Sequence, residues 1–154
     1  MTVLLIRPDS WNLPLLLHVG GAMALVASVT VAAVALLQGW RTGDDASAAS
    51  LKRFGARTLL YAAIPSFFVM RIAAEWALSR EGLENSNASW IGDGFIAADG
   101  GAVLLIVATI VANLAVRRAP DSGLGKLAKV GAGISLVMIA LYVFAIWAMT
   151  TKPS

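Results

Sequence analysis

Four long apolar runs constrain this chain more than any other feature of its sequence. They cover residues 13–38, 58–79, 94–116 and 127–149. Each has the roughly 20 mostly apolar residues that a helix needs to cross the hydrocarbon core of a bilayer. Unpaired backbone groups are costly in lipid, so such segments cross as helices. The sequence therefore predicts an all-α fold, a four-helix transmembrane bundle running up-down-up-down, as one integral membrane domain over residues 1–154.

The composition excludes several classes of protein. The chain has 154 residues, of which 58% are hydrophobic and 14% charged, whereas soluble domains average about 45–50% apolar and about 25% charged residues. These values exclude a disordered chain, a collagen, a coiled coil and an ordinary soluble enzyme. With no cysteine and a single histidine, the chain has no disulfide, no thiolate nucleophile and no Cys-ligated metal. Because no nucleophile motif is present either, we expect a non-enzymatic protein.

The basic residues predict the orientation of the helices. Eight lie in or beside the connections 39–57 and 117–126, namely Arg41, Lys52, Arg53, Arg57, Arg117, Arg118, Lys126 and Lys129. The opposite side carries three: Arg7, Arg80 and Lys152. Because cytoplasmic loops are enriched in Lys and Arg, we expect both connections in the cytoplasm and both termini outside, in a multi-pass protein of the cell membrane. The same rule accounts for the net charge of +3, so the expected partner of these residues is the lipid bilayer and not nucleic acid.

A second pattern relates the two halves of the chain. An ungapped shift of 76 residues superposes several pairs: Arg41 on Arg117, Leu51 on Leu127, Arg53 on Lys129, and Gly55-Ala56 on Gly131-Ala132. The match predicts two duplicated hairpins of the same orientation, related by an axis along the membrane normal. The alternative is that two short basic loops with small residues resemble each other without any duplication.

Small residues at four-residue spacing indicate where the helices pack, because lipid-embedded helices associate where backbones can approach closely. The first run carries such a ridge at Gly20, Ala24, Ser28 and Ala32. The third run offers Ala98/Ala102 and Ala108/Ala112, and the fourth offers Ala128/Ala132 and Gly131/Ser135. These ridges suit packing within the chain, and also suit a homo-oligomer or a subunit of a larger membrane complex.

Four ionisable residues fall inside the apolar runs and form the candidate ligand-binding site: His18, Arg71, Glu75 and Asp99. At 1.5 Å per residue they lie roughly 7–14 Å below the outer boundary, on three different helices. Ionisable residues inside a membrane are costly, so they face the bundle interior and mark functional sites. We expect Arg71 to face an anion, with Glu75 one turn later as its orienting partner.

The same residues have structural interpretations. Arg71 and Glu75 are spaced for an i,i+4 ion pair that makes both side chains tolerable in lipid. Asp99 either caps the start of the third helix or pairs with His18 or Arg71 across the bundle. His18 by itself fits a hydrogen-bonded interior residue. The sequence leaves these alternatives open.

The sequence does not identify a cofactor, but two kinds could involve His18. His18 with Asp93, Asp99 and Glu75 has the ligand types for a zinc or manganese ion, but Arg71 in the same layer opposes a metal. A b-type haem would take His18 as one axial ligand. Its second ligand would be Met23, Met70 or His18 of a partner subunit.

The leading hypothesis is a non-enzymatic polytopic membrane protein with a ligand-binding or accessory-subunit role. The alternative is a small proton- or ion-coupled transporter or channel, in which Glu75 or Asp99 titrates, and a b-type haem subunit is the third. Transport needs a polar path to the cytoplasmic side. Below the polar layer the sequence offers only hydroxyls and Asn113, which favours binding.

The residues Leu17-His18-Val19, followed by Gly21, lie near the outer end of the first run. In a chain of four spans, this string resembles the first helix of copper-resistance-D-type membrane proteins. It also resembles small four-helix bacterial membrane proteins of unknown function. The resemblance covers about five residues and the topology. It implies that His18 faces a site on the external side, while the second histidines and Met runs of the copper family have no counterpart in this sequence.

Overall fold

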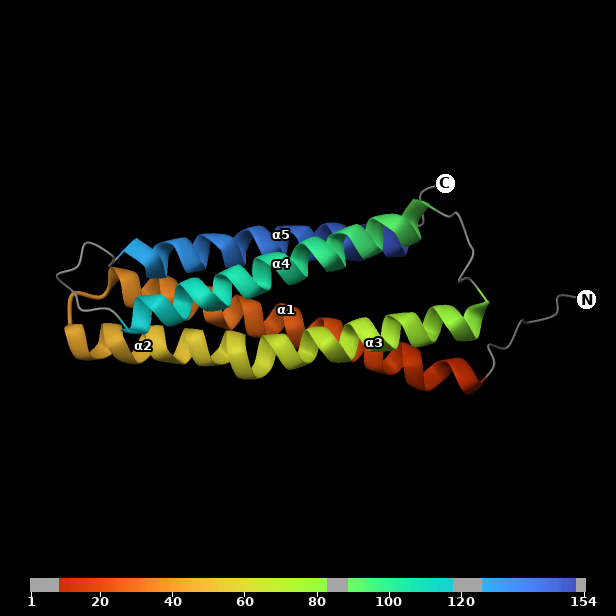
Figure 1. Ribbon diagram of the computed structural model, residues 1–154, viewed down its shortest axis with the longest axis horizontal. Coiled ribbons are helices and arrows are strands. Elements are labelled where there is room, and N and C mark those ends of the chain that lie inside the picture. The colour runs from red at the N-terminus through yellow and green to blue at the C-terminus, as the bar shows by residue number, and fades with distance from the viewer. Residues whose placement is uncertain (1–8, 83–88, 118–125, 152–154) are drawn as a thin grey trace, which may run out of the picture.

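The computed structural model describes residues 9–82, 89–117 and 126–151, and within them it is all-α, as predicted (Figure 1). Its elements are a short 3-10 turn (Asp9–Trp11), α1 (Asn12–Arg41), α2 (Asp45–Thr58), a π-helical turn (Leu59–Ala63), α3 (Ile64–Glu81), α4 (Ser89–Arg117) and α5 (Leu127–Thr151). Four helices are long and apolar enough to cross a membrane: α1, α2 joined to α3, α4 and α5. The predicted four-helix bundle is thereby confirmed.

The connection predicted at 39–57 is wrong, because most of it is helical. The α1 helix continues to Arg41 and α2 begins at Asp45, so only residues 42–44 connect them. Asp44 starts α2 by accepting a hydrogen bond from the Ser47 backbone N–H at 2.8 Å, as an N-cap residue does. Hydropathy locates the segment that suits lipid, whereas helix formation depends on backbone hydrogen bonds and continues through polar residues. The second helix therefore extends well beyond its apolar part.

Prolines within helices commonly cause kinks, and the structure shows a π-helical turn, Leu59–Ala63, just before Pro65. Proline lacks the N–H that would bond the carbonyl four residues earlier. Here the N–H of Ile64 donates to the Leu59 carbonyl, five residues back, which is the π-helical pattern. This turn lets α2 and α3 run on as one continuous helix (Figure 1).

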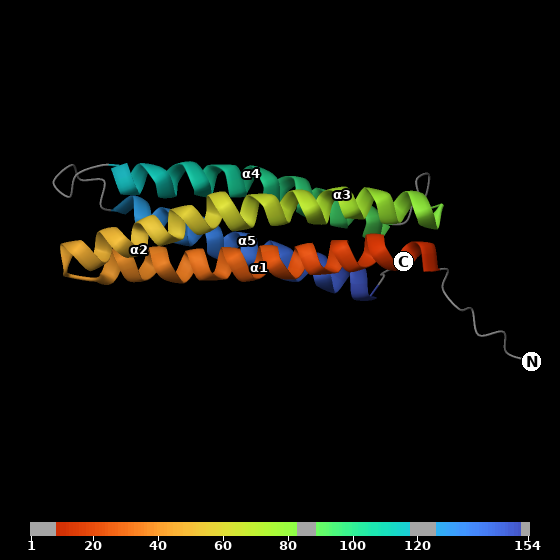
Figure 2. The same ribbon diagram turned by 90° about the horizontal axis from the view of Figure 1, so that it is seen from below.

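The helices form two close pairs, α1 with α2–α3 and α4 with α5, and α1 also packs along α5. At one end of the bundle, which we name the loop end, α1 and α4 finish and α2 and α5 begin; the opposite end, where α1 begins and α5 finishes, is the terminal end (Figures 1 and 2). Direct contacts between α3 and α4 are few. Side chains that bridge α3 and α4 therefore matter for how the two pairs are joined.

Leu36 of α1 is fully buried between two glycines of other helices. A Cβ on Gly55 of α2 would lie 2.9 Å from Leu36 Cγ, and one on Gly131 of α5 would lie 3.3 Å from Leu36 Cδ1. The absence of side chains at both positions lets three helices approach closely near the loop end. Gly55 and Gly131 are also equivalent under the shift of 76 residues noted in the sequence.

Buried positions in α1 and α4 repeat at the same interval. Six pairs 76 residues apart are buried in both helices: Gly21/Ala97, Leu25/Gly101, Val29/Leu105, Ala32/Ala108, Ala33/Thr109 and Leu36/Ala112. In the second and fourth helices the agreement holds near the loop end, at Gly55/Gly131, Ala56/Ala132 and Leu59/Ser135. This spacing of buried residues is what two duplicated hairpins would produce.

The small-residue ridge predicted on α1 is buried at Ala32 but not at its first two members. Gly20 and Ala24 are exposed, whereas Gly21, Leu25 and Val29 are buried. A four-residue spacing defines a line along a helix but does not decide which of several such lines faces the neighbours. On α4 and α5 the predicted small residues Ala108/Ala112, Ala128/Ala132 and Gly131/Ser135 are buried as expected.

Candidate functional site

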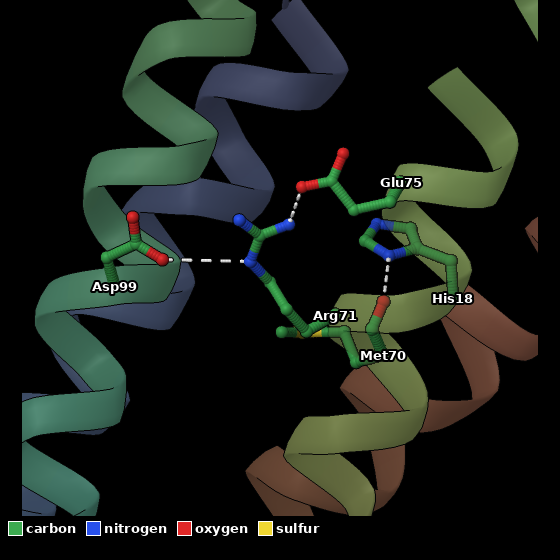
Figure 3. A network of polar contacts seen from close by, with 5 residues as sticks. All are labelled: His18, Met70, Arg71, Glu75 and Asp99. Atoms are coloured by element: carbon green, nitrogen blue, oxygen red, sulfur yellow. Dashed lines mark hydrogen bonds and ion pairs between the residues drawn. The ribbon is translucent and has the colours of Figure 1, made fainter. Parts of the chain in front are cut away.

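Arg71 of α3 is the centre of a polar cluster near the terminal end (Figure 3). Its Nη1 donates to Oε1 of Glu75, one helical turn later on the same helix. The predicted i,i+4 pair is therefore formed. Glu75 lies nearer the terminal end than Arg71, so the arginine side chain extends toward that end. A long basic side chain leaves the apolar region of a membrane in the same way.

Asp99 of α4 reaches Arg71 from the other side. The Arg71 Nε and Asp99 Oδ1 atoms are 3.6 Å apart, which is an ion pair but too long for a good hydrogen bond. The guanidinium carbon also lies 4.5 Å from the ring centroid of Phe95, one turn before Asp99 on α4, a cation–π contact. Since α4 begins at Ser89, ten residues earlier, the capping interpretation of Asp99 is wrong and the pairing with Arg71 is correct.

His18 approaches the cluster without joining it directly. Its Nδ1 lies 3.1 Å from the backbone carbonyl oxygen of Met70, the residue before Arg71. With Nδ1 protonated, the ring donates to that carbonyl and leaves Nε2 as its second polar atom. Of the four predicted site residues, Arg71, Glu75 and Asp99 contact one another, while His18 is linked to them through the α3 backbone.

The charges of the cluster do not balance. One guanidinium faces two carboxylates, which gives a formal charge of −1. The Arg71 side chain is 25% exposed, whereas those of Glu75 and Asp99 are 56% and 69% exposed. The cation is thus engaged by Glu75, Asp99 and Phe95, and both carboxylates remain more than half exposed. The expectation that Arg71 faces an anion has little support in this geometry.

Counting from the loop end gives the height of the cluster. At a rise of 1.5 Å per residue, Arg71 lies about 21 Å and Glu75 about 27 Å beyond Arg57. Asp99 lies about 27 Å beyond Arg117 on α4. For a hydrocarbon core about 30 Å thick, both carboxylates would stand near its edge, with Arg71 about one turn deeper. That position lowers the cost of three charges on helices that face lipid.

Any metal or haem site in this chain would rely on His18, because the chain has one histidine and no cysteine. No group of three or more His, Cys, Asp or Glu that could hold a metal ion occurs among the described residues, so the four-residue metal set with Asp93 is not assembled. Met70 is buried and Met23 is 69% exposed. A haem ligated by His18 remains a prediction.

The polar groups nearer the loop end are satisfied within their own helices. The hydroxyls of Thr109 and Ser135 donate to the carbonyls of Leu105 and Gly131. The Asn113 amide donates to the Thr109 carbonyl. These bonds follow the i to i−4 pattern that Ser and Thr commonly make in helices. Among the residues that the structure describes, none of these three side chains forms a hydrogen bond to another helix.

The sequence reasoning missed two groups that contact residues of the cluster, and one further buried polar group. Phe95 could have been found, because it lies one turn from Asp99 and hence on the same helix face. The Met70 carbonyl could not, since no side-chain pattern signals which backbone oxygen a histidine reaches. The third is Tyr142 of α5, whose hydroxyl is the buried side-chain polar atom without a hydrogen-bond partner in the part of the chain that the structure describes.

The fold and the four apolar helices together define a class: they indicate a multi-pass membrane protein of four helices. Comparison of the chain with protein-family models, curated proteins and solved structures finds no match. The resemblance of the His18 segment to copper-resistance-D-type proteins stays a prediction.

Proposed function

We propose that this chain is a non-enzymatic multi-pass membrane protein with a ligand-binding or accessory-subunit role. Its site is the cluster of Arg71, Glu75 and Asp99 at the terminal end. The group it binds carries positive charge: an organic cation, or a basic side chain of a second copy or of another subunit. With the termini outside the cell, this site faces the external leaflet.

Two features of the cluster carry the proposal: its carboxylates outnumber its guanidinium, and they are more exposed than the guanidinium. Arg71 is held on Nη1 by Glu75, near Nε by Asp99, and on its face by Phe95. Both carboxylates remain more than half exposed. A second cation would meet two carboxylates and one neutralised guanidinium, so its binding is favoured over that of an anion.

A matched pair of lipophilic ions tests the sign of the site. Tetraphenylphosphonium and tetraphenylborate have nearly the same size and opposite charge. We expect the purified protein to bind the phosphonium more tightly, and the Glu75→Gln/Asp99→Asn variant to lose this preference. Glu81→Gln, which removes an acid of α3 outside the cluster, should keep it. Equal or stronger binding of the borate to the wild type would contradict the proposal.

Transport has less support, because Thr109, Asn113 and Ser135, which lie below the cluster, bond within their own helices. A proton or ion path would need groups that connect helices toward the loop end. The haem alternative is tested by one absorption spectrum of the protein purified from its membrane, in which a Soret band would favour it.

A further inference from the structure

Seven basic residues gather at the loop end, far from the polar cluster of the terminal end. They are Arg41, Lys52, Arg53, Arg57, Arg117, Lys126 and Lys129. The acids described at the same end are Asp44 and Asp45, and Asp44 is engaged in capping α2. Within the described ranges none of the seven forms an ion pair. This end therefore presents unneutralised positive charge.

The side chains of Lys52 and Lys129 contact the end of α1 from two other helices. The Lys129 Nζ atom of α5 lies 4.8 Å from the ring centroid of Trp40. From α2, the stem of Lys52 rests on Gly39, where an added Cβ would lie 3.1 Å from Lys52 Cγ and 3.1 Å from the Ala48 carbonyl oxygen. Lysines of two other helices thus contact adjacent residues, Gly39 and Trp40, in the last turn of α1.

The level of these groups matches the surface of a lipid layer. Val130, next to Lys129, and Val34, six residues before Trp40, are apolar and 47% and 54% exposed. The apolar belt of the bundle therefore ends close to the indole and the ammonium group. Trp at such a boundary and Lys just beyond it stand where lipid headgroups lie.

From this geometry we infer a binding site for the phosphate of an anionic phospholipid at the last turn of α1, formed by Lys52 and Lys129 with Trp40. Each Lys near a membrane surface contributes about 1 kcal/mol to the attraction of anionic lipid. Two lysines would then favour an anionic over a zwitterionic headgroup about thirtyfold. The exposed apolar surface beside the site can contact the acyl chains of a phospholipid. A free phosphate ion has no such chains, so we expect the site to prefer the lipid.

The test is a titration followed by native mass spectrometry of the protein in neutral detergent. The ligands are dioleoyl phosphatidylglycerol, dioleoyl phosphatidylcholine and sodium phosphate. We expect the wild type to bind phosphatidylglycerol preferentially and the Lys52→Gln/Lys129→Gln variant to bind it about thirtyfold more weakly. Millimolar phosphate should not displace the lipid.

Two further variants keep the test decisive. Lys52→Arg/Lys129→Arg preserves the charges and should retain the preference, which shows that its loss in the glutamine variant is electrostatic. Arg80→Gln removes one charge at the terminal end and should also retain it, with helical content checked by circular dichroism. The inference is overturned by equal binding of both lipids, by a preference that survives in the glutamine variant, or by displacement with phosphate.

Discussion

A Cβ on Gly21 would lie 2.8 Å from the backbone nitrogen of Met70, so α1 and α3 are in backbone contact at this point. The contact lies beside the hydrogen bond between His18 and Met70, in which the His18 Nδ1 atom is 3.1 Å from the Met70 carbonyl oxygen. Together they set the position of α3 immediately before Arg71. The height and direction of the polar cluster thus depend on a glycine.

Gly21→Ala should destabilise the bundle, because the added methyl group meets backbone atoms that cannot rotate away. Overpacking of this kind costs about 1–3 kcal/mol. The neighbour Gly20 has nothing within 4 Å of its added Cβ. Gly20→Ala should therefore be neutral or raise the free energy of unfolding by up to about 1 kcal/mol through helix propensity. Unfolding in mixed micelles measures both, and equal effects would contradict the helix contact.

The ion pair of Arg71 and Glu75 should contribute little to stability. Both side chains are at least partly exposed, and i,i+4 pairs are typically worth about 0.3–0.5 kcal/mol. A double-mutant cycle with Arg71→Gln and Glu75→Gln should give a coupling energy of that size. A coupling above about 2 kcal/mol would mean that the pair is a main support of the fold, contrary to the proposed binding role.

Tyr142→Phe should raise the free energy of unfolding by about 1 kcal/mol, because it removes a buried hydroxyl that has no hydrogen-bond partner. The Tyr142 residue is 5% exposed. Its ring lies against Gly101, where an added Cβ would be 2.6 Å from Cε1. Gly101→Ala should accordingly destabilise the protein. A loss of stability in Tyr142→Phe, measured in the same micelle assay, would show that the hydroxyl has a partner.

Asp44 should make the start of α2 sensitive to acid. Hydrogen bonds from the Ser47 side chain and then from its backbone lower the pKa of the Asp44 carboxyl from its ordinary 3.8. A pKa lowered by folding stabilises the folded state above the ordinary value, and this contribution is lost as the pH falls through the lower, folded-state value. Thermal unfolding followed by circular dichroism should show this loss. The assay would run from about pH 2.5 to about pH 6, which spans the ordinary pKa of an aspartate. Asp44→Asn should lack the loss, since a neutral amide still caps, and superimposable pH curves for the two proteins would contradict the role.

Single cysteines test the predicted orientation, since the chain has none of its own. A membrane-impermeant maleimide added to intact cells should label Arg80→Cys at the terminal end. Lys52→Cys at the loop end should react only after permeabilisation. The reverse pattern would place the basic end outside and contradict the positive-inside interpretation.

Neither the extent of the second helix nor the buried face of the first could be predicted from the sequence. Hydropathy found the apolar part of both, because transfer into lipid depends on each residue by itself. The helical stretch from Asp45 to Thr58 contains Lys52, Arg53 and Arg57, which a hydropathy scan assigns to a loop. The buried face of α1 depends on its neighbours, and so Gly21 and not Gly20 proved to be the contact residue.

The sequence alone determined the fold class, four apolar helices, and the few ionisable residues that could matter within them. Those properties follow from local chemistry: apolar length, charge and the cost of both in lipid. Only the tertiary structure decided that Arg71 is shared between Glu75 and Asp99, that His18 bonds to a backbone oxygen, and that the carboxylates stay exposed. These outcomes depend on how α1, α3 and α4 rotate and approach one another, and backbone contacts at glycines such as Gly21 fix that approach.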